Sequence, residues 1–199
     1  ITSGIDLAKL DLRSGLERLT YSIIIVLGAT MFAWIMALLL KLQPQDFVAL
    51  HLGSMMHLVL RLIASFCGVF GFSIMFNSSV YIAATAACIG AVANTLRLEL
   101  VDYTGMPSAA AAFIGALTAG LLASIIKRNH GYPRISLTVP SIVIMVPGLY
   151  LYRAIYNFGI MSLTEAVLWF AAAIMIIVSL PLGLIFVRIL TDRTFRYCS

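Results

Sequence analysis

The stretch TVPSIVIMVPGLYLYRAIYNFG, residues 138–159, holds the residues whose types and spacing could do chemistry. Pro140 and Pro147 lie seven residues apart in it, and Gly148 follows the second proline. Proline inside a helix removes a backbone donor and clashes with the preceding turn, so we expect an apolar helix that is broken here. Irregular backbone inside a membrane persists only where it is buried in protein or lines a polar cavity, and its freed amides and carbonyls can bind solutes and ions. A kinked helix with a purely structural role explains the two prolines equally well.

Two arginines near apolar segments could bind a carboxylate, because the guanidinium fork matches carboxylate geometry. Arg153 follows the predicted break, although a side chain that snorkels to water at a membrane border is the simpler explanation. Arg61 lies about one turn inside its apolar segment, where an unpaired cation is costly and often marks a pathway or a partner. An interfacial position at the end of a longer helix is the alternative for Arg61. We predict these substrate-binding residues: Pro140, Pro147, Gly148, Tyr152, Arg153, Asn77 and Arg61.

The remaining polar residues give weaker indications. Glu99, Asp102 and Glu165 lie near predicted membrane borders and could carry protons, but solvated loop carboxylates are the favoured interpretation. Further groups that could face a cavity are Asn94, Thr85 and Thr118. His51 and His57 are six residues apart, which is off the same-face spacings of a helix, and the three cysteines show no metal-ligand spacing. We therefore expect no metal and no cofactor.

Composition identifies the solvent around this chain. Of its 199 residues 62% are hydrophobic and 11% are charged, with a mean hydropathy of +1.05. Soluble domains are about half apolar and about a quarter charged, so lipid must cover much of the surface. The net charge of +5 comes from bases scattered between apolar runs, which is typical of membrane borders and argues against a nucleic-acid partner. The sequence has no P-loop, no HExxH and no paired membrane aspartates, so we expect neither an ATP-driven pump nor an enzyme.

The elements that must position these residues are apolar segments of roughly 20 residues, the length needed to cross a membrane as a helix. The sequence predicts an all-α membrane protein, a bundle of about six transmembrane helices, one of them broken by proline and glycine. The predicted spans are Leu19–Leu40, His57–Phe76, Val80–Leu96, Pro107–Ile126, Ile135–Tyr152 and Leu163–Leu190. We expect a tight turn at residues 77–79, a polar loop from Arg97 to Pro107 that includes Glu99 and Asp102, and a kink at Pro181.

The basic residues also predict an orientation. With a cytoplasmic N-terminus, the inner segments hold most of the bases: Lys9, Arg13, Arg18, Lys127, Arg128, Arg134, Arg188, Arg193 and Arg196. Only Lys41, Arg97 and Arg153 would then lie outside. This asymmetry follows the positive-inside rule, requires the broken segment to cross the membrane, and predicts that both termini are cytoplasmic.

Small residues predict how the helices meet. Gly115 and Ala119 lie four residues apart, as do Ala116 and Gly120, and Ala83, Ala87 and Ala91 repeat the spacing in the preceding span. Small residues at this spacing let helix backbones approach closely. Close packing is the favoured interpretation of these faces, although they would also allow helices to slide during transport.

Four stretches together resemble the threonine/serine exporter (ThrE) family, in its C-terminal membrane domain, which in some bacteria is a separate small subunit. They are GFSIMFN (71–77), the small-residue run 109–123, VPSIVIMVPGLYLYRA (139–154) and MSLTEA (161–166). The resemblance covers roughly residues 58–190, and the P-x6-PG-x3-YRA pattern is its specific part. It implies export of small hydrophilic metabolites across a bacterial inner membrane, threonine and serine in some members and dicarboxylates such as succinate in others, coupled to the proton gradient.

The N-terminal part also resembles this family. Residues 11–35 are similar to the end of its other domain, and SGLERL (14–19) aligns with SLTEAV (162–167) as an internal repeat. We therefore predict that residues 1–43 are the end of a first repeat with its last helix and that residues 44–57 are an interfacial connection. Residues 58–190 would be a second repeat of about five helices, and residues 191–199 a cytoplasmic tail. The start at Ile1 fits a processed chain or the C-terminal part of a longer one.

The leading hypothesis is a secondary-active exporter of threonine/serine-type amino acids. A dicarboxylate exporter, a passive channel and a structural or assembly subunit of a two-part transporter are the alternatives. The expected partners are the lipid bilayer, the small-molecule substrate, and either the N-terminal half or partner subunit of the same transporter or a second copy of this chain.

Overall fold

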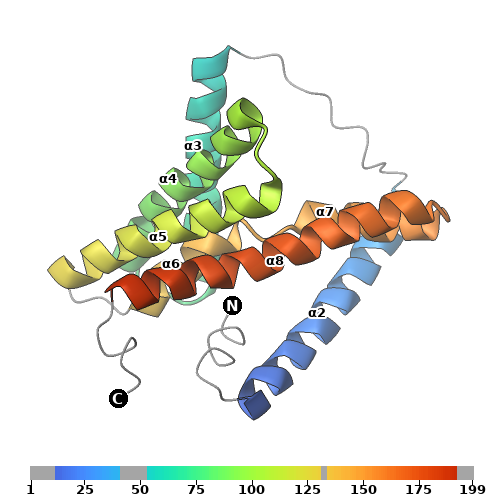
Figure 1. The fold of residues 1–199 in the computed structure, drawn as a ribbon, viewed down its shortest axis with the longest axis horizontal. Coiled ribbons are helices and arrows are strands. Elements are labelled where there is room, and N and C mark those ends of the chain that lie inside the picture. The colour runs from blue at the N-terminus through green and yellow to red at the C-terminus, as the bar shows by residue number, and fades with distance from the viewer. Residues whose placement is uncertain (1–11, 41–52, 131–133, 192–199) are drawn as a thin grey trace. The chain divides into compact units, whose positions relative to one another are not determined.

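The computed structural model describes residues 12–40, 53–130 and 134–191. Seven α-helices and no strand lie in these ranges: α2 (Leu12–Leu39), α3 (Ser54–Met75), α4 (Val80–Thr104), α5 (Ser108–His130), α6 (Arg134–Val143), α7 (Gly148–Gly159) and α8 (Leu163–Thr191) (Figure 1). Five of them are long and apolar enough to cross a membrane, or six spans if α6 and α7 together make one broken span. The predicted all-α membrane fold is therefore confirmed.

The helices divide into two compact units, which are described separately. One unit contains α2, α7 and α8 up to Ile177, and the other contains α3 to α6 and α8 from Val178. The border between the units lies at Val146 and Pro147, in the interruption of the predicted broken span.

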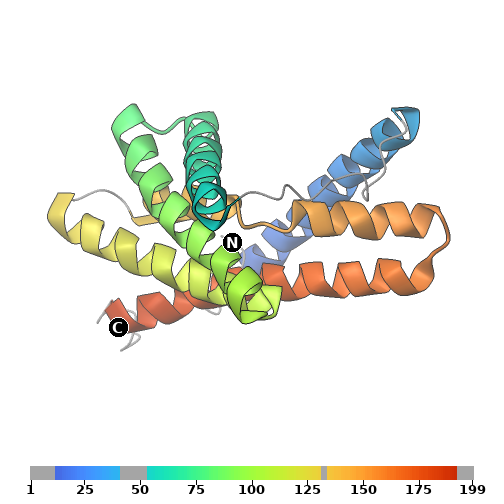
Figure 2. The same cartoon turned by 90° about the horizontal axis from the view of Figure 1, so that it is seen from above.

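A helical hairpin of α3 and α4 forms one side of the second unit, and both ribbon views show the two helices side by side (Figures 1 and 2). The turn between them closes α3 with a Schellman motif around Asn77, which has a positive φ of 58°. The Asn77 amide bonds to the Ile74 carbonyl at 2.9 Å and the Ser78 amide bonds to the Ser73 carbonyl at 3.2 Å. The predicted tight turn is thus present, because Asn tolerates this left-handed conformation better than other residues with a side chain.

Helix α4 is the centre of the second unit and packs against α3, α5 and α6. Its buried residues are mostly small, and Ala83 and Ala87 are fully buried. Gly90 is the point of closest approach to α6, because a Cβ there would lie 3.1 Å from the Cα and carbonyl oxygen of Ser141. The small residues predicted to let helices meet are therefore used for that purpose.

Helix α5 packs closely on two neighbouring helices, α4 and α8, through its small residues. A Cβ on Gly115 would meet the Arg97 side chain of α4 and the Met145 sulfur at 3.2 Å, and a Cβ on Gly120 would meet Val187 of α8 at 3.2 Å. Gly183 of α8 packs in turn on the backbone of Phe113. Backbone approaches of this kind give van der Waals contact where lipid removes the hydrophobic driving force between helices.

The predicted broken span is interrupted at residues 144–147, between α6 and α7. Pro147 occupies the N-cap position of α7, and Gly148 is the first residue of the helix. Proline is tolerated there because N–H groups at the start of a helix have no intrahelical acceptor. Pro140 lies within α6 instead of breaking it. Of the two prolines, the second therefore marks the interruption. Helix α8 continues through Pro181.

One boundary prediction was wrong. Residues 97–102 were expected in a loop, but α4 continues to Thr104, so Arg97, Glu99 and Asp102 are helical. A helix can carry charges near a membrane border when neighbouring helices supply partners for them.

Candidate functional site

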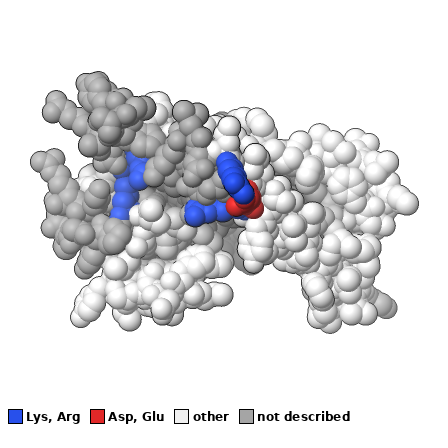
Figure 3. All heavy atoms as spheres, turned by 90° about the horizontal axis from the view of Figure 1, so that it is seen from below, with Lys and Arg blue, Asp and Glu red and all other residues white. Residues whose placement is uncertain are grey.

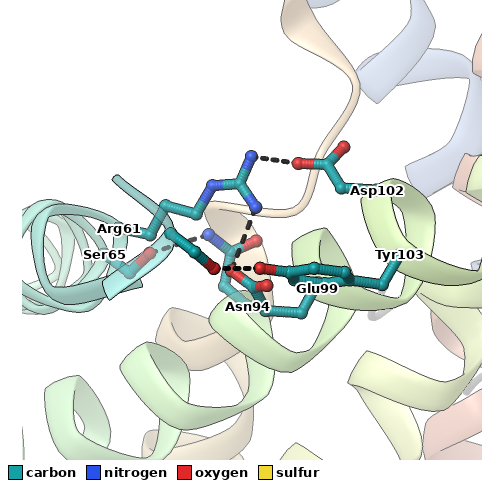
Figure 4. A network of polar contacts seen from close by, with 7 residues as sticks. Arg61, Ser65, Asn94, Glu99, Asp102 and Tyr103 are labelled. Carbon is teal, nitrogen blue, oxygen red and sulfur yellow. Dashed lines mark hydrogen bonds and ion pairs between the residues drawn. The ribbon is translucent and has the colours of Figure 1, made fainter. Parts of the chain in front are cut away.

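A charged cluster joins the two helices of the α3–α4 hairpin. One terminal nitrogen of Arg61 donates to Oε1 of Glu99 at 3.1 Å, and the other donates to Oδ2 of Asp102 (Figure 4). Glu99 and Asp102 lie three residues apart on α4, so both carboxylates face α3. The side chains of Arg61 and Glu99 are 18% and 19% exposed, and that of Asp102 is 50% exposed. Neither carboxylate lies in a loop as the sequence predicted, although Asp102 is half exposed, and Arg61 is ion-paired within the protein.

A second polar layer lies one helical turn deeper in the hairpin. The amide nitrogen of Asn94 donates to the Ser65 hydroxyl at 2.8 Å, and both residues are buried. Among the described residues Asn94 Oδ1, which is also buried, has no hydrogen-bond partner. Figure 4 shows Arg61 and Ser65 from α3 and Asn94, Glu99 and Asp102 from α4 turned toward one another.

The position of this layer along the helices is close to their middle. Ser65 is eleven residues after the start of the 22-residue α3, so at 1.5 Å per residue it lies about 16 Å along the helix. The Arg61 cluster lies nearer the end of the hairpin that holds Ser54 and Tyr103, whose hydroxyls are hydrogen-bonded to each other. The hairpin therefore carries polar groups from this end to its middle.

A second arginine of this unit holds the interrupted segment. Arg97 donates from a terminal nitrogen to the carbonyl of Met145 at 3.1 Å. Carbonyls at a helix end lack intrahelical partners, so an arginine from α4 satisfies one that the break exposes. Gly115 makes this contact possible, because any side chain there would press on both Arg97 and Met145.

Helix α6, which precedes the break, is fixed from the side of α4. The Ser141 hydroxyl lies within hydrogen-bond distance of the carbonyls of Ala86 (2.9 Å) and Leu137 (2.6 Å). Pro140 and Ser141 are buried, as are three neighbouring residues of α6: Leu137, Thr138 and Ile142. The segment before the break is thus packed into the second unit.

The other unit holds Arg153 in a different environment. Its guanidinium carbon lies 4.7 Å from the centre of the Trp169 ring, and Tyr150 meets the same ring edge to face with centroids 5.5 Å apart. Tyr152 packs on Tyr156, with ring centroids 6.4 Å apart. No carboxylate among the described residues forms an ion pair with Arg153. Its charge is therefore supported by a ring face, while the edge of its guanidinium plane keeps N–H donors.

The predicted site residues do not gather at one point. Tyr152 and Arg153 belong to the first unit, whereas Arg61, Asn77 and Pro140 belong to the second. Arg61 and Asn77 lie 16 residues apart, near opposite ends of α3. Pro147 is buried and Gly148 is exposed at the interruption.

Three further residues of the site were missed or misplaced by sequence reasoning: Ser65, Arg97 and Glu99 in its role as partner of Arg61. The spacing of Arg61 and Ser65, one helical turn apart within an apolar run, was a usable signal for a polar face. His57 lies on α3 one turn before Arg61, and His51 lies outside the described residues.

Charge is sparse on the face of the described surface that Figure 3 shows. In Figure 3 most described atoms belong to neither basic nor acidic residues, and the acidic side chains visible on that face lie against basic ones. Within the part of the chain that the structure describes, no group of three or more His, Cys, Asp or Glu residues could hold a metal ion.

Comparison with known proteins gave one finding. A family model described as "Threonine/Serine exporter, ThrE" matches residues 61–190, which is more than half of the chain and includes α4 to α7 completely. The comparisons with curated proteins and with solved structures gave no match.

Proposed function

Because the chain belongs to the threonine/serine exporter family, we propose that it is a secondary-active exporter of threonine/serine-type amino acids driven by the proton gradient. Family membership and the long apolar helices make it a multi-pass membrane transport protein. We place it in a bacterial inner membrane with both termini in the cytoplasm, in agreement with the distribution of its bases.

One observation supports a carrier above all. The protein contains two apolar helices, α6 and α7, separated by a short break, and Arg97 donates to the carbonyl of Met145 at this break. Discontinuous helices are common at the solute sites of secondary transporters, because they offer backbone groups inside the membrane. Pro147 and Gly148 would form the hinge at this interruption, and buried Pro140 would fix the segment before it.

Arg153 is our proposed ligand for the carboxylate of the solute. Its cation–π contact with Trp169 orients the guanidinium without a carboxylate partner among the described residues. Tyr152, adjacent to it on α7, would add a hydroxyl to the same binding region. Arg61 would act elsewhere, through its ion pairs with α4. The helix-end geometry accounts for Asn77, so we propose for it the role of closing the α3–α4 turn.

A second function is favoured by one specific observation. The membrane-spanning part of α2 is not buried inside the protein, which suits a helix that contacts a partner such as the N-terminal half of the transporter, a partner subunit or a second copy. In that case the chain would assist assembly and the partner would carry the solute. A dicarboxylate exporter is the alternative within the carrier class, because one arginine suits either substrate.

Counterflow of labelled threonine, serine and succinate in proteoliposomes tests these proposals. We expect saturable exchange of threonine and serine. Arg153→Ala should raise the half-saturation concentration by about tenfold or more, which is the effect of losing one charged hydrogen-bonded contact. Arg13→Ala is the matched control, because Arg13 is an arginine of the same unit that is 92% exposed and paired with Glu17 on its own helix. Exchange of succinate alone would select the dicarboxylate alternative.

The assembly function makes a different forecast. Arg153→Ala would then change the recovery of a complex with a partner and leave the half-saturation concentration unaltered. Saturable exchange by the correctly folded chain in vesicles that contain no other protein would exclude this alternative.

A further inference from the structure

We infer that the polar layer at the middle of the α3–α4 hairpin is a binding subsite for an ammonium group, with Asn94 Oδ1 as its hydrogen-bond acceptor. The subsite rests on the proposed function, since the ammonium would be that of the exported amino acid, bound here at a step of its passage separate from its contact with Arg153. It consists of Asn94 and Ser65, and Glu99 lies five residues after Asn94 on α4 (Figure 4).

The unpartnered acceptor is the first observation. Asn94 is 5% exposed and Ser65 is 3% exposed, and Asn94 gives its amide nitrogen to Ser65 while its oxygen has no partner among the described residues. A buried acceptor without a donor is costly, and more so among helices that lie in lipid. The Asn94 oxygen is therefore available to a donor that arrives from elsewhere.

Charge is the second observation, and it is independent of the first. Two carboxylates, Glu99 and Asp102, share the single guanidinium of Arg61, so the cluster carries one negative charge in excess. Arg97, the arginine of α4, donates to the Met145 carbonyl, which follows α6. The excess charge attracts a cation and repels a dicarboxylate, because like charges in a low dielectric interact strongly.

An ammonium satisfies both observations at once. It carries three N–H donors and one positive charge, whereas a hydroxyl supplies one donor and no charge. A site near the middle of the membrane-spanning helices also matches the depth at which transporters bind their solutes. The Arg61 cluster then lies between this subsite and the nearer end of the hairpin.

The test measures binding and stability separately. The probes are threoninol, an amine without a carboxylate, and 3-hydroxybutyrate, a carboxylate without an amine, each added to the detergent-solubilised chain during thermal unfolding. We expect threoninol to raise the Tm of the unaltered chain and 3-hydroxybutyrate to have a smaller effect. Asn94→Leu should abolish the threoninol effect, and Asn94→Asp, which keeps an acceptor at the same position, should retain it.

Asn94→Leu also separates binding from structure. Because Asn94→Leu keeps a similar volume but leaves the buried Ser65 hydroxyl without its partner, it is combined with Ser65→Ala. We expect the unliganded Tm of this double variant to stay nearly equal while threoninol binding weakens by about tenfold or more. Ser73→Ala is the matched control, because Ser73 is also a fully buried polar residue of this hairpin whose oxygen has no partner among the described residues. It lies two turns beyond Ser65 and should leave threoninol binding unchanged.

The outcomes are distinct from those of the proposed function. An equal threoninol response in the unaltered chain and in Asn94→Leu overturns the subsite, whatever the transport assay shows. No threoninol response in the unaltered chain overturns it as well. Loss of threonine exchange from all preparations, together with a threoninol response that depends on Asn94, would overturn the exporter proposal and leave the ammonium subsite standing.

Discussion

The two arginines that the sequence singled out, Arg61 and Arg153, lie in different units and are stabilised in opposite ways. Arg61 is fixed by two carboxylates of the neighbouring helix, and Arg153 rests on the face of an indole ring. An arginine that already holds carboxylates has little left to offer a solute, whereas a stacked arginine is oriented and keeps donors at its edge. The contrast separates an arginine that joins helices from an arginine that can receive a ligand.

The largest effect is expected from replacing Arg61, the arginine that joins two helices. Arg61→Met leaves Glu99 and Asp102 facing α3 without a cation, and losing the charged hydrogen bonds of this partly exposed cluster costs about 2–3 kcal/mol. We expect a marked fall in Tm and in the yield of folded protein, measured by fluorescence-detected size exclusion after heating.

A neutral cluster supplies the control. Arg61→Gln combined with Glu99→Gln and Asp102→Asn removes all three charges, and we expect stability to return to within about 1 kcal/mol of the unaltered protein. If the single and triple variants lose equal stability, the cost comes from packing and the electrostatic contrast fails.

A moderate effect is expected where Arg97 of the second unit bonds to the carbonyl at the interruption. Gly115→Ala forces a methyl group to 3.2 Å from both Arg97 and Met145, so the contact between Arg97 and the Met145 carbonyl should loosen. Overpacking of this kind costs about 1–3 kcal/mol, measured as a fall in Tm.

Gly148→Ala is the companion change on the other side of the break. A Cβ at Gly148 meets no heavy atom within 4 Å, so we expect no fall in Tm. Equal losses from the two alanine variants would mean that Gly115 has no special relation to Arg97.

The smallest effect is expected from removing the ring that supports Arg153. Trp169→Leu removes the ring under Arg153 and keeps an apolar side chain, so it should weaken the interaction by about 0.5–1 kcal/mol. We expect a twofold to fivefold higher half-saturation concentration for threonine and a nearly unchanged Tm. The double variant Arg153→Ala/Trp169→Leu should have the same half-saturation concentration for threonine as Arg153→Ala alone, because the ring would act only through the guanidinium.

Much of the fold could be predicted because lipid imposes simple rules on sequence. The lengths of the apolar runs predicted every described long helix, and Pro147 with Gly148 predicted the interruption. The end of α4 was missed because Arg97, Glu99 and Asp102 have the composition of a loop. Their partners, Met145 and Arg61, are 48, 38 and 41 residues distant in the chain, and local spacing cannot show such contacts.

The site was less predictable for a related reason. Residue type showed that Arg61 and Arg153 needed explanation, but it could not tell which of them had a carboxylate partner. Asn94 was visible only as one of several polar groups in apolar runs, since the missing partner of its oxygen is a property of the packed hairpin. A polar side chain in a membrane helix is a clear signal, and its partner is a three-dimensional fact.

The left-handed residue that ends α3 has a counterpart at the end of α7. Met161 has a φ of 62°, and the amides of Met161 and Ser162 bond to the carbonyls of Phe158 and Asn157 at 3.2 and 2.9 Å, the pattern seen around Asn77. In both turns the backbone N–H and C=O groups are hydrogen-bonded within a few residues. Neither pair of helices therefore needs a long polar loop, which would have to be solvated or moved across the membrane. The α3–α4 and α7–α8 pairs can therefore each form their turn and enter the bilayer together during synthesis. Their turns depend only on local hydrogen bonds, which form before contacts between distant helices.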